Sequence, residues 1–115
     1  MIKKKTKQRI AIYSGTFDLF TQGHLDITLR ACELFDRVVL LIAVNPSKTS
    51  WFSLEERMQM LRKLFLANPK ISVDSWVGLT IDYAKKNGIA TIVRGLRPIG
   101  DFESEYQMAS MNRKL

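Results

Sequence analysis

Apolar residues occur in four short runs, separated by longer stretches in which they recur at helical spacing. The runs predict strands over 9–14, 37–44, 71–77 and 90–93. The second run is almost continuously apolar and rich in β-branched residues, which is typical of a central strand covered on both faces. The spacing between the runs predicts helices over 22–35, from Ser53 to the pair at 68–69, over 79–87 and over 101–113.

The ends of these helices carry recognisable signals. Ser53 and Glu56 have the spacing of a capping box, in which an N-cap hydroxyl and a residue three positions on satisfy backbone N–H groups. The Asn87-Gly88 pair is typical of a helix C-terminus. Regular alternation of strands and helices with short connections predicts an α/β fold, a doubly wound parallel sheet with helices on both faces. We expect one domain over 1–115, with a basic tail over 1–8.

Composition narrows the class of protein. The chain has 115 residues, 46% of them hydrophobic, and no apolar run approaches the roughly 18 residues of a membrane span. Its start is basic without the apolar segment of a secretory signal. The single cysteine, Cys32, excludes an internal disulfide and lies on the apolar side of the first helix, so we interpret it as a core residue. These features predict a cytoplasmic protein that is not bound to a membrane.

The charge balance indicates acidic partners. With 18 basic and 11 acidic residues, the net charge is +7. Nucleotides, nucleic acid and phosphorylated metabolites are the ligands that such a charge favours. Four of the lysines lie in the first seven residues, where we expect a solvated tail.

The stretch from Tyr13 to His24 has the layout of an anion site. A strand ends in a turn containing Gly15 and Thr16, and a helix then begins close to the histidine. Backbone N–H groups at such a helix start, together with the helix dipole, favour a bound anion. The stretch therefore predicts phosphate handling, with His24 facing the anion. The alternative is an ordinary strand-to-helix turn in which Asp18 caps the helix.

Basic residues from other loops support the first interpretation. Lys48 follows the second strand, and Arg94 and Arg97 follow the fourth. Ligands of parallel α/β sheets bind at the carboxyl ends of the strands, so these loops converge with the turn at Thr16. Such a site suits the joining of two phosphates, where positioning and charge neutralisation supply most of the rate. The chain has no Walker sequence, and its one histidine excludes a His-rich metal site.

Several motifs together resemble one enzyme family. They are Gly-Thr-Phe-Asp (15–18), Thr-x-Gly-His (21–24), Lys48, Ser-Leu-Glu-Glu-Arg (53–57), Arg-Gly-Leu-Arg (94–97), Asp-Phe-Glu (101–103) and Met-Asn-Arg-Lys-Leu (111–115). This set resembles the bacterial phosphopantetheine adenylyltransferases of the HxGH nucleotidyltransferase superfamily. Related cytidylyltransferases usually have His where this chain has Thr21. The resemblance covers residues 9–115.

The resemblance implies transfer of the adenylyl group of ATP to 4′-phosphopantetheine, with Mg²⁺, by direct in-line attack. It implies that His24 stabilises the transition state and that Thr16 contacts both substrates. The phosphopantetheine site would comprise Thr16, Lys48, Thr80 and Arg94, and the ATP site Thr16, Phe17, His24, Gly95, Leu96, Arg97 and Glu105. Catalytic roles would fall to His24, Thr16, Lys48 and Arg97. No protein metal ligand and no nucleic-acid partner is implied, and the family is typically hexameric.

The chain departs from the family pattern at two points, and several alternative functions remain. Ser14 stands where the family commonly has Pro, which we expect to loosen the turn, and the family continues beyond the position of Leu115, so we expect the fold to be truncated at its carboxyl end. A truncated domain that binds without turnover, a cytidylyltransferase and a small RNA-binding module are the alternatives. Arg57 and Arg62 are interpreted as a solvated helix face, and Trp51 with Phe52 as packing or a subunit interface.

Overall fold

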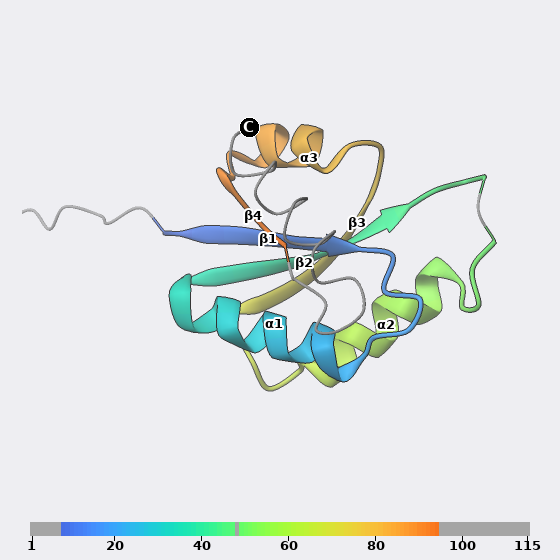
Figure 1. Ribbon diagram of the computed structural model, residues 1–115, viewed down its shortest axis with the longest axis horizontal. Coiled ribbons are helices and arrows are strands. Elements are labelled where there is room, and N and C mark those ends of the chain that lie inside the picture. The colour runs from blue at the N-terminus through green and yellow to red at the C-terminus, as the bar shows by residue number, and fades with distance from the viewer. Residues whose placement is uncertain (1–7, 48, 95–115) are drawn as a thin grey trace, which may run out of the picture.

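The computed structural model describes residues 8–47 and 49–94, and these form a parallel sheet between two layers of helices (Figure 1). The strands are β1 (Ile10–Gly15), β2 (Arg37–Val44), β3 (Ile71–Val77) and β4 (Thr91–Val93). Their order is β3-β2-β1-β4, and every pairing is parallel. The predicted α/β doubly wound fold is therefore confirmed.

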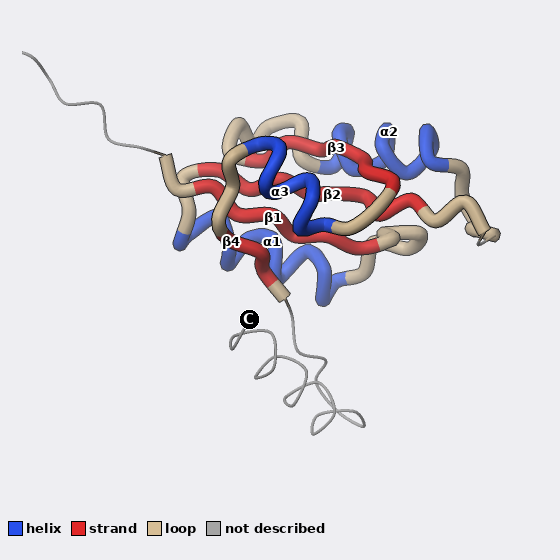
Figure 2. Tube along the Cα trace, turned by 90° about the horizontal axis from the view of Figure 1, so that it is seen from above, coloured by secondary structure: helices blue, strands red, loops and turns tan. Residues whose placement is uncertain are grey.

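Within the described residues, three helices cover the sheet. Helices α1 (Gln22–Leu34) and α2 (Leu54–Leu64) lie on one face, and α3 (Thr80–Asn87) lies on the other (Figure 2). Residues of β2 supply the core on both sides: Val38, Leu40 and Ile42 pack beneath α1 and α2, whereas Val39 and Leu41 pack toward α3. This alternation confirms that β2 is a central strand covered on both faces.

The ends of the helices follow the local sequence, with one difference. Ser53 caps α2 through the predicted box, and Gly88 ends α3 in the left-handed region at φ 67°. Helix α2 ends at Leu64, four residues before the predicted stop, because the backbone turns at Phe65, whose carbonyl accepts the Asn68 N–H. The predicted helix over 101–113 and the lysine-rich start over 1–7 lie outside the described residues.

The α3 face has its own polar anchor. The hydroxyl of Tyr83 donates a hydrogen bond of 2.7 Å to the Asp74 carboxylate at the edge strand β3. Burial, and then this bond and the charge of Asp74, raise the pKa of Tyr83 to about 12.

Cys32 is buried in the core on the opposite side of the sheet, as predicted, and burial raises the pKa of its thiol. None of the three helices is long and apolar enough to cross a membrane.

Candidate functional site

The candidate site lies where the order of the strands reverses. The sheet grows from β1 to β2 to β3 in one direction, and β4 then pairs with the opposite edge of β1. Val93 is in register with Tyr13, so Arg94 follows β4 beside the end of β1. In open parallel sheets this reversal opens a crevice at the carboxyl ends of the strands. The predicted convergence of the loops after β1 and β4 is therefore built into the topology.

The turn after β1 has a strained backbone. Phe17 has φ 47°, a left-handed conformation that is uncommon for a residue with a side chain. Its ring is 2% exposed and packs edge-on against Tyr13, with ring centroids 5.4 Å apart. The ring also passes close to Gly15, where an added Cβ would lie 3.0 Å from it. Packing thus holds the turn in one conformation, and Thr16 with it.

His24 is held at the start of α1 by a capping box. Its backbone N–H donates to the Thr21 hydroxyl at 3.3 Å, and its Nδ1 accepts the Thr21 N–H at 3.0 Å. The ring also contacts the rings of Phe17 and Phe20, with centroids 5.3 and 5.4 Å away. Because Nδ1 accepts a hydrogen bond, the neutral ring carries its proton on Nε2. The arrangement fixes both the tautomer and the orientation of the ring.

Thr80 reaches the same end of the sheet from the α3 side. Its hydroxyl donates a hydrogen bond of 3.3 Å to the hydroxyl of Ser14, the residue before Gly15. Ser14 belongs to β1, where it is in register with Leu41, so it does not loosen a turn. Ser14, at the position where the family commonly has Pro, thus provides a polar partner for Thr80.

Arg57 is a buried residue of the site, contrary to the prediction from the sequence. The residue is only 5% exposed, so the predicted solvated face is wrong at this position, although Arg62 is exposed as expected. Its Nη1 donates to the Thr16 carbonyl at 2.8 Å, and its Nε donates to the Ser53 carbonyl at 3.3 Å. Arg57 lies three residues after Leu54 and four before Leu61, on the apolar side of α2. That spacing was the signal that could have identified it.

Asp18 has a different role from the predicted helix cap, since Thr21 is the N-cap of α1. Its two carboxylate oxygens accept the backbone N–H groups of Trp51 and Phe52 at 2.7 and 2.8 Å. The bond from Trp51, then that from Phe52 and the charge of Arg57, lower the pKa of the carboxyl below its ordinary value. Asp18 thus ties the turn after β1 to the loop that leads into α2.

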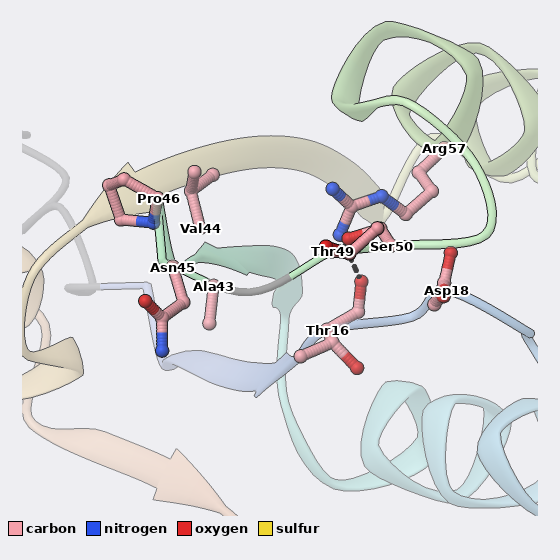
Figure 3. Close-up of a pocket in the computed structure, with 9 residues that line it drawn as sticks. All are labelled: Thr16, Asp18, Ala43, Val44, Asn45, Pro46, Thr49, Ser50 and Arg57. Carbon is pink, nitrogen blue, oxygen red and sulfur yellow. Dashed lines mark hydrogen bonds between the residues drawn. The ribbon is translucent and has the colours of Figure 1, made fainter.

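A pocket of about 390 Å³ lies between these two loops (Figure 3). It is lined by Thr16, Asp18, Ala43, Val44, Asn45, Pro46, Thr49, Ser50 and Arg57. The close-up shows Arg57 reaching from α2 toward Thr16, with the dashed hydrogen bond between them. Of the predicted site residues within the described ranges, only Thr16 lines this pocket, whereas His24, Thr80 and Arg94 do not.

The remaining predicted residues divide into two groups. Arg94 is exposed directly after β4, and Trp51, interpreted as packing or an interface, is exposed to 86%. Lys48, Gly95, Leu96, Arg97 and Glu105 lie outside the described residues. Within 8–47 and 49–94 no cluster of His, Cys, Asp and Glu could hold a metal ion, and both oxygens of Asp18 already accept N–H groups.

Comparisons with known proteins identify the family of this chain. The profile of the cytidylyltransferase-like family matches residues 12–115. Proteins named phosphopantetheine adenylyltransferase from Carboxydothermus hydrogenoformans and Leptospira biflexa are 53% and 49% identical, over 93% and 92% of this chain. The chain spans 66% of the length of each of these two relatives.

The fold is also found in solved structures. The lipopolysaccharide core biosynthesis protein of Thermoplasma volcanium superposes with a TM-score of 0.62 at 16% identity, over 92% of this chain and 90% of its own. Similarity at this level of identity supports the fold alone. The family profile and the two bacterial relatives together confirm the resemblance in the sequence motifs: the chain belongs to the cytidylyltransferase-like family, and its relatives there are named phosphopantetheine adenylyltransferase.

Proposed function

We propose that this protein transfers the adenylyl group of ATP to 4′-phosphopantetheine, giving dephospho-coenzyme A and pyrophosphate. The observation that carries the proposal is that Thr16, just after β1, and His24, in the first turn of α1, stand at the two ends of one connection beside the reversal of strand order. The names of the relatives support the choice of substrates. In this reaction a phosphate oxygen of phosphopantetheine attacks the α-phosphorus of ATP, and the bond from that phosphorus to pyrophosphate breaks.

Thr16 is the proposed contact to both substrates. It lies in a turn whose conformation is fixed by the buried Phe17 ring, so its backbone is positioned before a ligand arrives. Two reacting phosphates repel each other, and a preorganised donor placed between them reduces that repulsion without reorganising during the reaction. Arg94, exposed at the end of β4, adds positive charge for the phosphopantetheine phosphate.

His24 is the proposed donor to the transition state. Its Nδ1 is committed to Thr21, so the proton on Nε2 is the one that would stabilise charge developing on the α-phosphate oxygens. The proton stays on the ring, because the proposed role is to stabilise this charge by a hydrogen bond and not by proton transfer. No covalent intermediate on the protein is needed.

The remaining assignments follow the motifs. We assign Lys48 and Thr80 to the phosphopantetheine site, with Lys48 also taking part in catalysis, and Phe17, Gly95, Leu96, Arg97 and Glu105 to the ATP site, with Arg97 also catalytic. The expected Mg²⁺ neutralises phosphate charge when bound, and it would arrive mainly as the complex with ATP, since Mg²⁺ is commonly held by substrate phosphates.

We also propose that the protein is a cytoplasmic homo-oligomer, a hexamer in the family that the motifs resemble. Exposed apolar residues such as Leu66 and Leu79, at 84% and 66%, support association between subunits, which light scattering of the purified protein would test.

The test is a mass-spectrometric assay of this protein with Mg²⁺ and 4′-phosphopantetheine, with ATP and CTP in parallel. Dephospho-coenzyme A with ATP alone is the expected product. A cytidylylated product would show that CTP, not ATP, is the donor. Measurable ligand binding without any product would favour a binding domain without turnover.

A further inference from the structure

We infer that Arg57 is a positioning residue for the site: its guanidinium sets the peptide between Thr16 and Phe17 and so places Thr16 for phosphate binding. This inference rests on the proposed function for the ligand, but the structural contact that carries it does not. The contact joins helix α2 to a turn 41 residues earlier in the sequence. Nothing in the local sequence of the turn requires such a partner.

The burial of Arg57 shows that its contacts are specific. At 5% exposure, the polar groups of Arg57 need protein partners, and two of its donors have them: Nη1 donates to the Thr16 carbonyl at 2.8 Å and Nε to the Ser53 carbonyl at 3.3 Å. The planar fork of arginine fixes the relative positions of both acceptors. The bond to Ser53 anchors the guanidinium at the start of α2, and the bond to Thr16 transmits that anchor to the turn.

The effect on the turn follows from the planarity of the peptide bond. Holding the Thr16 carbonyl toward α2 fixes the orientation of the whole peptide unit, including the N–H of Phe17. The same unit sets ψ of Thr16 and φ of Phe17, and φ of Phe17 is left-handed at 47°. A left-handed residue with a side chain persists only where its surroundings hold it. Buried packing holds the Phe17 ring, and the bond from Arg57 holds its peptide.

Asp18 completes the arrangement on the other side of Phe17. Its carboxylate accepts the N–H groups of Trp51 and Phe52, just before α2 begins. The turn is therefore tied to α2 by the arginine that donates to it, and to the loop before α2 by the carboxylate that accepts from that loop. Thr16 lies within this frame and lines the pocket beside it.

The first experiment measures binding of 4′-phosphopantetheine by calorimetry. Arg57→Met keeps the length and apolar stem but removes the donors, and we expect affinity to fall about tenfold, as for a lost charge-assisted hydrogen bond. Arg62→Met, an exposed arginine of the same helix, is the matched control and should bind as the unsubstituted protein does. In a Thr16→Ala background the effect of Arg57→Met should shrink, because Arg57 acts through Thr16. An equal loss in both backgrounds would overturn the inference.

The second experiment needs no ligand. In the unsubstituted protein, the three-bond coupling between the amide and α protons of Phe17 should report a left-handed φ, and the Nη1 protons of Arg57 should be protected from exchange. Arg57→Lys, which keeps the charge but loses the fork, should move Phe17 out of that conformation while the protein stays folded. Unprotected Nη1 protons, or an unchanged coupling in the variant, would overturn the role of Arg57. Absence of binding by the unsubstituted protein, with this coupling pattern intact, would instead overturn the proposed function.

Discussion

Helices α1 and α2 both begin with a capping box, in which the N-cap residue and the third helical residue each satisfy the other's backbone N–H. In α2 the pair is Ser53 and Glu56, with bonds of 3.1 and 2.9 Å. In α1 the pair is Thr21 and His24, with bonds of 3.3 and 3.0 Å. The geometry is shared, but the accepting groups differ.

The difference lies in the hydrogen-bonding groups that each accepting side chain carries. A carboxylate has only acceptors, so Glu56 can do no more than cap its helix and satisfy the dipole. A neutral imidazole has one acceptor and one donor, so committing Nδ1 to the cap leaves a proton on Nε2. The same local device therefore serves stability in α2, and in α1 it also orients a hydrogen-bond donor at the end of β1.

The largest expected effect comes from making the two boxes alike. His24→Glu gives α1 the ordinary box of α2, so the fold should be kept while the Nε2 proton is lost. We expect kcat for adenylyl transfer to fall about 10²–10³-fold, as for the loss of one transition-state donor. Steady-state kinetics measures the change in kcat, and circular dichroism shows whether the fold is kept. Glu56→Gln is the control and should leave kcat unchanged; an unfolded His24→Glu variant would make His24 a structural residue instead.

Removing the N-cap hydroxyls separates stability from activity. Thr21→Ala and Ser53→Ala should each reduce the free energy of unfolding by about 1 kcal/mol, because each leaves an N–H at a helix start without its hydroxyl acceptor. Only Thr21→Ala should also lower kcat, by roughly tenfold, since it loosens the residue that orients the imidazole. Urea unfolding and kinetics on the same preparations compare the two. Equal kcat values in both variants would remove the proposed link between cap and chemistry.

Acid should act on the box of α2 through the carboxylate of Glu56. The bond from the Ser53 N–H, with help from the Ser53 hydroxyl, lowers the pKa of Glu56 below its ordinary value of 4.5. A carboxyl whose pKa is lower in the folded state contributes stability above its unfolded pKa, and that contribution is lost as the pH falls through the folded value. We therefore expect the Glu56 carboxyl to titrate below 4.5 in an NMR pH series. Ser53→Ala should move the midpoint upward, because it removes the help of the hydroxyl.

Helix α3 provides a third case, a helix whose N-cap residue makes no capping bond, and the smallest expected effect. This N-cap is Leu79, which is 66% exposed, and Asp82 stands at the third helical position. Leu79→Ser should create the missing cap and raise the free energy of unfolding by about 0.5–1 kcal/mol. Thermal and urea unfolding would detect this gain. A loss of stability instead would mean that Leu79 contributes packing that outweighs a cap.

The sequence predicted the elements well because their signals are local. The apolar run at 37–44, the box at Ser53 and the glycine at 88 each determine structure within a few residues. The site was predicted less completely, because its frame joins distant segments. The partner of Arg57 is a backbone carbonyl 41 residues away, and the partners of Asp18 are N–H groups 33 and 34 residues away. Backbone groups carry no residue-specific signal, so sequence patterns do not reveal such contacts.

The box in α1 was missed for a different reason. The usual capping-box pattern has Glu or Gln at the third helical position, and a histidine there is read first as chemistry. Thr21 and His24 were therefore predicted as parts of an anion site, but not as partners. The predicted start of this helix at residue 22 is confirmed, so only the identity of the residue at its third position hid the box.

The two tryptophans give the molecule a pair of optical reporters in contrasting environments. Trp51 is largely exposed to water while its backbone is held by Asp18 beside the candidate site. Trp76 lies edge-on to Tyr83, with ring centroids 5.5 Å apart, and the ammonium of Lys86 sits 5.4 Å from the centroid of its ring. Fluorescence from Trp51 should therefore be red-shifted and respond to whatever approaches the loop, whereas Trp76 should report only the integrity of the sheet. Single Trp→Phe variants would let one spectrum follow ligand arrival and the other follow unfolding.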